Sequence, residues 1–419
     1  MRRLRPETVW YSYEGIASFL WTLVFTVAAV YFVTELGMSP FELVVVGTVM
    51  ELSVFLFEVP TGIVADMYSR RLSIVIGNVV MGAAFLFIGG LDAVWAVLVG
   101  YAVWGFGWTF TSGAMEAWLA DEVGTERVTS VYLRGAQIGR VGSVLGIGAA
   151  VGLGLVDLRL PIVLGGAGTI LLAVFYALAM PEHGFSPLER GERGSFAQMA
   201  HTGRAGAQLV RAQPLLLAIL GIAAFAGMWS ESYDRLWQAH VIRDVGLPTV
   251  GGLEPVVWFG LFAVVGMLLA IAVAEPLRRR LEDAGPEKLA RTLFRLDALL
   301  LLASLLFALA GALWLAMLAS FTLFLARDLA SPIFAAWLNR SVKESSVRAT
   351  VLSITNQADA VGQWTGGPAL GAVGSVFGIR AALVAGAACL LPALALYRRA
   401  IHHHGREPVL EQLPEPVEP

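Results

Sequence analysis

Ionisable side chains interrupt several long apolar runs of this 419-residue chain. Glu51, Glu116 and Asp359 each lie inside such a run, and so does Arg140. A charged group at the centre of a bilayer costs at least roughly 2.5–3.5 kcal/mol, so it usually faces a partner or a wet cavity. A carboxylate that alternates between apolar and charged surroundings can bind and release a proton. The three carboxylates are therefore the candidate proton carriers, of which we expect at least one to function, with Arg140 as counter-charge; static ion pairs that fix helix packing are the alternative.

Aromatic side chains occur deep in the same apolar runs. Some of the aromatic residues must belong to the interfacial belts, but four lie deeper, and a carboxylate and a guanidinium occupy the outer half of the run 214–241. Such aromatic faces can stack on a planar amphipathic molecule, although packing in the core is the more frequent role. The predicted substrate-cavity residues are Trp104, Trp108, Trp229, Tyr233, Asp234 and Arg235.

The composition indicates which elements must hold these residues. Hydrophobic residues make up 57% of the chain and charged residues 15%, and the mean hydropathy is +0.71. Soluble domains are closer to one quarter charged. The apolar runs are long enough to cross a ~30 Å hydrocarbon core as helices of ~20 residues. Because the first run lacks a small-residue cleavage site, we expect it to be retained as a helix.

The apolar runs and the polar breaks between them predict twelve transmembrane helices in two sets of six. A polar segment rich in Gly, Arg and Ser separates the two sets. The expected helices lie near 9–33, 40–64, 72–91, 94–119, 130–154, 160–180, 214–241, 252–275, 293–312, 314–339, 349–372 and 378–397. The expected domains are an N-terminal six-helix bundle (1–180), a cytoplasmic linker (181–213), a C-terminal six-helix bundle (214–400) and a cytoplasmic tail (401–419).

The distribution of Lys and Arg predicts the orientation. The two termini and the loops expected on their side carry 21 of these residues, whereas the opposite loops carry only Arg159, Arg243 and Arg380. Positive charge is enriched in cytoplasmic loops. We therefore predict a multi-pass protein of a bacterial-type cell membrane, with both termini in the cytoplasm.

The two halves of the sequence repeat one another. Residues 117–119 (Ala-Trp-Leu) recur as 336–338, and Gln137, Gly142 and Gly146 recur 220 positions later. Residues 35–37 (Glu-Leu-Gly) likewise match 244–246 (Asp-Val-Gly). Parallel repeats of this kind surround an axis along the membrane normal. The sequence thus predicts an all-α membrane protein of two pseudo-symmetric six-helix bundles, with its glycines in close helix contacts.

The segment 62–71, Gly-Ile-Val-Ala-Asp-Met-Tyr-Ser-Arg-Arg, resembles the loop signature of the major facilitator superfamily between helices 2 and 3. The segments 57–62, 112–118 and 234–237 look like the drug:proton antiporter branch of tetracycline and macrolide exporters. The loop departs from the superfamily signature at two positions. Met67 stands where the signature has a basic residue, and Ser69 stands where it has glycine. Exporters are expected to have a Gly-Pro pair in their fifth helix, here 130–154. In this sequence the pair occurs in the eleventh expected helix instead (349–372), at positions 367–368.

The resemblance implies a conformational latch at the inner face. Gly62 would let two helices approach closely, and Arg70 would pair with Asp66 and with Asp121 at the inner end of helix 4. Arg71 completes the basic pair of this cluster. The alternative is that the two arginines only satisfy the charge bias of cytoplasmic loops.

Several function classes are excluded or disfavoured by the sequence. No phosphate-binding Gly-x4-Gly-Lys-Ser/Thr loop occurs, so no nucleotide-driven pump is expected. A net charge of −3 indicates no nucleic-acid partner, and the single cysteine gives no disulfide or thiolate metal site. We predict a monomeric, cofactor-free secondary transporter in the lipid bilayer, not an enzyme, which exports amphipathic drugs or similar small molecules in exchange for protons. Transport of a specific small metabolite is the main alternative, and a non-transporting sensor on the same fold is another.

Overall fold

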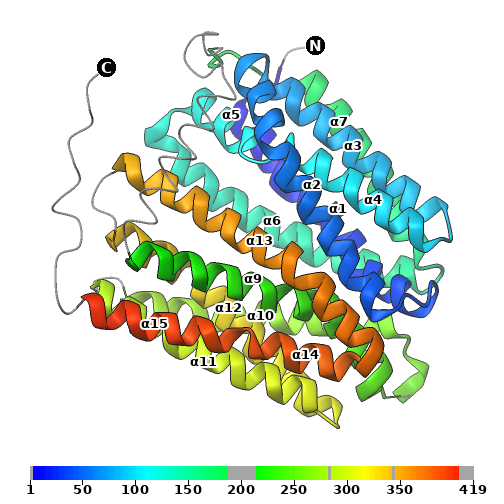
Figure 1. The fold of residues 1–419 in the computed structure, drawn as a ribbon. Helices are drawn as coiled ribbons and strands as arrows, with labels where there is room; N and C mark the ends of the chain where they lie inside the picture. The colour runs from blue at the N-terminus through cyan, green and yellow to red at the C-terminus, as the bar shows by residue number, and fades with distance from the viewer. Residues whose placement is uncertain (1–2, 187–213, 249, 282–284, 342–344, 405–419) are drawn as a thin grey trace. The chain divides into compact units, whose positions relative to one another are not determined.

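The computed structural model describes residues 3–186, 214–248, 250–281, 285–341 and 345–404, and in these residues all regular structure is helical. Figure 1 shows the helices in chain order. In the first half they are α1 Pro6–Thr34, α2 Pro40–Met67, α3 Arg70–Gly90, α4 Val94–Thr109, α5 Ala114–Val123, α6 Thr125–Gly154 and α7 Arg159–Ala179. In the second half they are α9 Pro214–His240, α10 Pro255–Leu281, α11 Pro286–Leu309, α12 Leu313–Ser341, α13 Ser345–Phe377, α14 Ile379–Ala388 and α15 Leu390–His404.

Local signals explain where several helices begin and end. Ser39 and Glu42 form a reciprocal capping box at the start of α2, in which the Glu42 N–H donates to Ser39 Oγ over 3.3 Å and the Ser39 N–H donates to Glu42 Oε2 over 2.7 Å. Gly37 (φ 61°) and Gly246 (φ 84°) follow the helices α1 and α9 at equivalent repeat positions. Both turns require the left-handed backbone that glycine adopts without strain.

The all-helical, multi-span architecture predicted from the apolar runs is confirmed. Eleven segments of the described chain are long and apolar enough to cross a membrane, counting α4 with α5 and α14 with α15. Helix α13 covers the remaining predicted span, 349–372.

Two helix breaks and several helix ends differ from the expectation. The span predicted at 94–119 bends between α4 and α5, where Gly113 adopts a φ of 71°. The last span is likewise divided, at Cys389. Helix α11 begins at Pro286, seven residues before the predicted start at 293. A proline at the first helical turn is favourable because its missing N–H has no helical partner there.

The helices group into two compact units. Unit 1 comprises Met1–Ser195, Arg235–Val264 and Gly371–Val376, and unit 2 comprises Phe196–Asp234, Val265–Leu370 and Phe377–Pro419. The predicted domains 1–180 and 214–400 follow chain order, whereas the two units divide α9, α10 and α13 between them. The linker after Ser186 and the tail after His404 lie outside the described residues.

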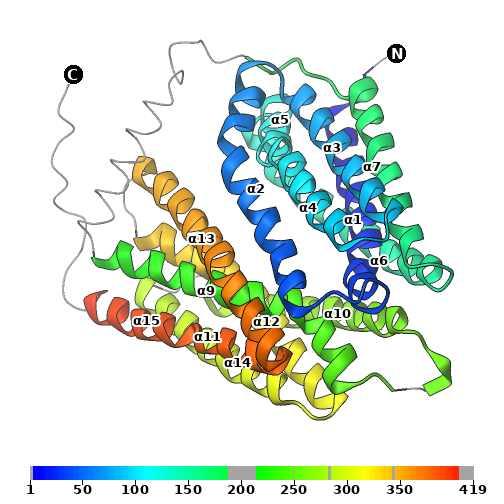
Figure 2. The same ribbon diagram turned by 45° about the vertical axis from the view of Figure 1, so that its right-hand side comes forward.

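Unit 1 is built on two closely packed helix pairs, α1 with α6 and α3 with α7. Figure 1 and Figure 2 both show α3 running alongside α7. A methyl group added at Gly142 of α6 would overlap the carbonyl oxygen of Gly15 on α1, so the two backbones are in direct contact. Trp118 and Tyr176 are 1% and 0% exposed in the core of this unit.

Unit 2 repeats this packing at the positions that the internal repeat predicts. Gly362 of α13 lies 220 positions after Gly142, and a methyl group there would overlap the carbonyl oxygen of Ala224 on α9. Ala224 in turn follows Gly15 by 209 positions, the same offset that relates the glycine turns after α1 and α9. The cores correspond as well, since Trp337 and Tyr397 are buried in unit 2. These matched contacts explain why glycines recur in the two helices.

Candidate functional site

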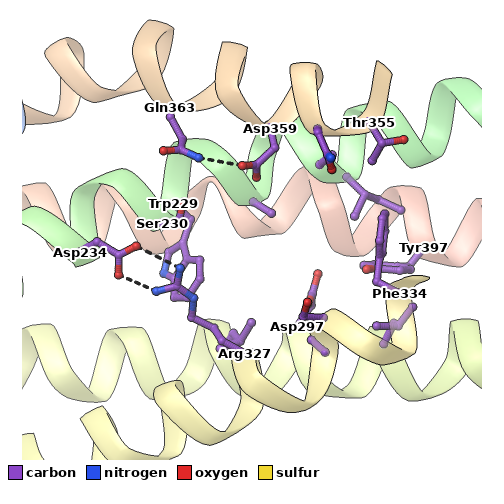
Figure 3. Close-up of a pocket in the computed structure, with 18 residues that line it drawn as sticks. Trp229, Ser230, Asp234, Asp297, Arg327, Phe334, Thr355, Asp359, Gln363 and Tyr397 are labelled. Atoms are coloured by element: carbon purple, nitrogen blue, oxygen red, sulfur yellow. Dashed lines mark hydrogen bonds and ion pairs between the residues drawn. The ribbon is translucent and has the colours of Figure 1, made fainter. Parts of the chain in front are cut away.

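A pocket in unit 2 gathers charged and polar side chains from α9, α11, α12, α13 and α15. Its volume is about 470 Å³, which is within the usual range of small-molecule sites, roughly 300–1,000 Å³. Figure 3 shows the side chains that line it. The polar and aromatic lining residues are Trp229, Ser230, Asp234, Asp297, Arg327, Ser331, Phe334, Thr355, Asn356, Asp359, Gln363 and Tyr397.

Three of the charged residues lie at the middle of their helices. Asp297 is the twelfth of the 24 residues of α11, Arg327 the fifteenth of the 29 residues of α12, and Asp359 the fifteenth of the 33 residues of α13. The centre of a membrane-spanning helix is the most expensive position for a charge, unless the charge is paired or faces a polar cavity. The pocket supplies such a cavity.

Arg327 is held from two sides. Its Nη1 and Nη2 atoms donate to the two carboxylate oxygens of Asp234 over 2.5 and 3.0 Å, which is the bidentate geometry that suits a guanidinium. Its guanidinium carbon lies 5.3 Å from the ring centroid of Trp229, in a cation–π contact. The Trp229 ring is fixed in turn, since its Nε1–H donates to Ser304 Oγ over 2.8 Å and the ring stacks on Tyr233. The cation of the pocket is therefore already positioned and neutralised by Asp234.

The two other carboxylates are less well compensated. Asp359 accepts one hydrogen bond, from Gln363 Nε2 over 2.7 Å. Asp297 is 6% exposed and makes no hydrogen bond or ion pair to any residue that the structure describes. In Figure 3 its carboxyl group points into the pocket, between Arg327 and the rings of Phe334 and Tyr397. Asp297 is thus the buried acid without a protein partner in the described part of the chain.

Of the predicted substrate-cavity residues, Trp229 and Asp234 line this pocket. Tyr233 stacks on Trp229 with 6.0 Å between the ring centroids, and its hydroxyl oxygen is 2.7 Å from Ser320 Oγ. Tyr233 therefore supports the wall of the pocket without lining it. Arg235 belongs to unit 1 and is half-buried.

The other two aromatic candidates lie in unit 1. Trp104 and Trp108 stack with 5.8 Å between ring centroids, and Trp21 contacts both. Trp104 is 7% exposed, which is typical of core packing, whereas Trp108 is half-buried. Trp104 and Trp108 thus form an aromatic cluster with Trp21 inside unit 1.

The predicted proton carriers are divided between the two units. Asp359 lines the pocket of unit 2, while Glu51 is half-buried on α2 of unit 1. Glu116 is exposed near the start of α5. Arg140, the expected counter-charge, is exposed on α6 and forms no ion pair within the described residues. The guanidinium in the pocket with Asp359 is that of Arg327.

The residues of the predicted latch lie at one end of unit 1, where α2 meets α3. Arg70 contacts the carboxylate of Asp121 on α5, and its Nη2 is 3.9 Å from an oxygen of Asp66. Among the described residues the structure does not contain the close helix approach expected at Gly62, because a methyl group there would meet no described atom within 4 Å.

A short segment after α7 binds the same loop. The carboxylate of Glu182 accepts hydrogen bonds from Ser69 Oγ over 2.8 Å and from the Arg71 N–H over 2.9 Å. Ser69 also caps α3 with an extended backbone (φ −174°), so the turn needs no glycine. The departure from the family pattern at this position is therefore compatible with the turn and adds a hydrogen bond.

Sequence reasoning missed Asp297, Arg327 and Asn356 as site residues. The late predicted start of α11 made Asp297 look like a residue near a helix end, when it is in the middle. Arg327 was detectable, since an arginine 14 residues inside a predicted span is as costly as the charges that were singled out.

Comparisons with known proteins agree with this architecture. The chain is 21% identical over 383 residues to the uncharacterized MFS-type transporter YxaM of Bacillus subtilis (strain 168), with 91% of each chain covered. Among solved structures, it is similar to a mutant of the nucleoside transporter NupG, with a TM-score of 0.76, 12% identity, and 94% of this chain and 100% of that chain covered. It also resembles a POT family transporter in complex with 5-aminolevulinic acid (TM-score 0.73, 13% identity, 96% of both chains).

These relatives are transporters and not enzymes, and identities this low establish the fold alone for the solved structures. The family model of the Major Facilitator Superfamily matches residues 14–347, which is most of the chain. The protein is a multi-pass membrane transporter that belongs to the Major Facilitator Superfamily.

Proposed function

We propose that this transporter couples the movement of a small organic molecule to protons, and that it exports amphipathic compounds. The observation that carries the proposal is the pair of incompletely compensated carboxylates, Asp297 and Asp359, in a pocket at the middle of α11 and α13. Such a carboxylate is most stable at mid-membrane when it is neutral or faces a cation. Binding and release of a proton at this depth is the step that links a proton gradient to transport.

The direction of transport rests on the sequence resemblance to drug:proton antiporters. The cavity adds a physical argument, because aromatic and aliphatic walls beside two acidic groups suit an amphipathic molecule. The Arg70–Asp121 contact supports a further proposal, that this end of unit 1 opens and closes during the cycle. On the predicted topology this end and both termini face the cytoplasm, and the two sequence halves move as the domains 1–180 and 214–400.

Transport of one specific polar metabolite is the second candidate, and one observation favours it. Asn356, Gln363, Ser230 and Thr355 line the pocket, so hydrogen-bonding groups are more frequent there than the sequence alone indicated. A site that hydrogen-bonds its ligand discriminates strongly against analogues that lack the matching groups.

The two candidates differ in a growth experiment. Cells without their major exporters would express the protein and be exposed to a panel of amphipathic antibiotics and dyes, with and without a protonophore. Protonophore-sensitive resistance to several unrelated compounds supports export of amphipathic molecules. Unchanged sensitivity to the whole panel, with uptake or release of one polar metabolite, would favour the second candidate. A variant with Glu287→Gln, at the exposed start of α11, is the expression-matched control.

A further inference from the structure

The charges of the pocket in unit 2 do not balance. Three carboxylates and one guanidinium line it, those of Asp234, Asp297, Asp359 and Arg327. The ion pair of Arg327 with Asp234 accounts for one of each sign. The remaining two acids leave the cavity with an excess of negative charge whenever both are ionised, which favours a positively charged occupant.

Asp297 is the acid with the greatest need of a partner. It is 6% exposed, and no described residue donates a hydrogen bond to it. An ionised carboxylate that is buried without a donor or a counter-ion is strongly destabilised. Its oxygens face the cavity (Figure 3), so the proton or the cation that neutralises it reaches it from the cavity side.

The walls around Asp297 indicate an organic ion. Phe334 and Tyr397 lie on the side of Asp297 away from the Asp234–Arg327 pair (Figure 3), and Leu293 and Leu300 add aliphatic surface. Aromatic faces attract ammonium groups. A hard inorganic ion prefers several oxygen ligands, and the described residues contain no group of three or more His, Cys, Asp or Glu side chains arranged to hold a metal ion.

We propose that Asp297 binds the protonated amino group of the transported molecule, so that the substrates are small amines with an aromatic or aliphatic body. The inference rests on the proposed transport function and names its substrate class. The ammonium group donates hydrogen bonds to the Asp297 carboxylate, and the apolar body lies against Phe334 and Tyr397. Because a proton and an ammonium group compete for the same carboxylate, binding of one displaces the other.

Binding to the purified, detergent-solubilised full chain tests the proposal without any gradient. The probes are matched pairs of arylalkylamines and isosteric alcohols, for example 2-phenylethylamine and 2-phenylethanol, measured by ligand-dependent shifts of the unfolding temperature and by titration of tryptophan fluorescence. A charge-assisted hydrogen bond contributes roughly 1.5–3 kcal/mol, so the amines should bind about ten- to hundredfold more tightly. Asp297→Asn should abolish that preference, whereas Asp297→Glu and Glu287→Gln should keep it.

Four binding results would overturn the proposal of an amine site at Asp297. Equal binding of amines and alcohols, a preference that survives Asp297→Asn, or no amine-dependent stabilisation across the panel would remove the amine site. Stabilisation by NaCl over choline chloride that disappears in Asp297→Asn would show an inorganic cation instead. Amine binding without proton-coupled flux in vesicles would retain the amine site but refute the transport mechanism, so the two proposals fail separately.

Discussion

The direct backbone contact between α1 and α6 makes a strong prediction about two glycines of the same helix. Gly142 faces the carbonyl oxygen of Gly15, whereas a methyl group at Gly148 would meet no atom of the described residues within 4 Å. Both lie inside α6, Thr125–Gly154, so replacement by alanine gives each the same gain in helix propensity, about 1 kcal/mol. Only Gly142→Ala forces the helices apart, because the obstructing atom belongs to the backbone and cannot rotate away.

The propensity gain cancels when the two variants are compared. The difference in their free energies of unfolding is then the cost of overpacking, about 1–3 kcal/mol, with Gly142→Ala the less stable. The assay is equilibrium unfolding in mixed micelles by titration with sodium dodecyl sulfate, followed by tryptophan fluorescence. Because Gly362 makes the equivalent contact with Ala224, Gly362→Ala should behave as Gly142→Ala does. Stabilities of the two α6 variants within about 0.5 kcal/mol of one another would refute the close packing.

Three further predictions concern the latch, the ion pair and the topology. Arg70→Ala removes the contact with Asp121 and should slow flux in reconstituted vesicles sharply at near-normal abundance; a fall in abundance alone would make the cluster structural. Arg327→Gln breaks the ion pair with Asp234 and should lower the free energy of unfolding by about 1 kcal/mol, because the two side chains are 37% and 40% exposed. Adding Asp234→Asn removes the carboxylate left without its partner and should recover most of that loss. A double-mutant cycle measures the recovery, and its absence would contradict a pairwise interaction. A phosphatase active only outside the cytoplasm should give no signal when fused within 181–213, and a strong signal there would overturn the predicted orientation.

Much of the fold was predictable because apolar runs, caps and repeats are local properties of the chain. The repeat offsets of 209 and 220 positions relate contacts that the structure does contain, Gly15 with Gly142 and Ala224 with Gly362. Helix breaks were less predictable. Gly113 bends the span of α4 and α5, yet apolar residues continue on both sides of it, with Glu116 as the one charge before Leu119.

The candidate site was only partly predictable, because it depends on which helix faces meet. Trp229, Asp234 and Asp359 were identified by type and depth, and they line the pocket. The mid-helix position of Asp297 could be predicted only from the correct start of α11. The polar residues in the first turn after Pro286 made that start hard to recognise in the sequence. Similarly, Glu182 lies in the polar segment 181–213, whose composition predicts a linker, and only the folded chain shows its hydrogen bonds to Ser69.

The carboxylates in the pocket of unit 2 are proposed to couple transport to protons. The most direct measurement uses proteoliposomes with an imposed pH gradient and a radiolabelled compound drawn from the resistance panel. Wild-type protein should accumulate the compound against its gradient, and Glu287→Gln should do the same. The variant with Asp297→Asn and Asp359→Asn should lose the accumulation while remaining folded in the membrane. Accumulation at the wild-type level by this double variant would contradict the account and transfer the coupling role to Glu51 or Glu116.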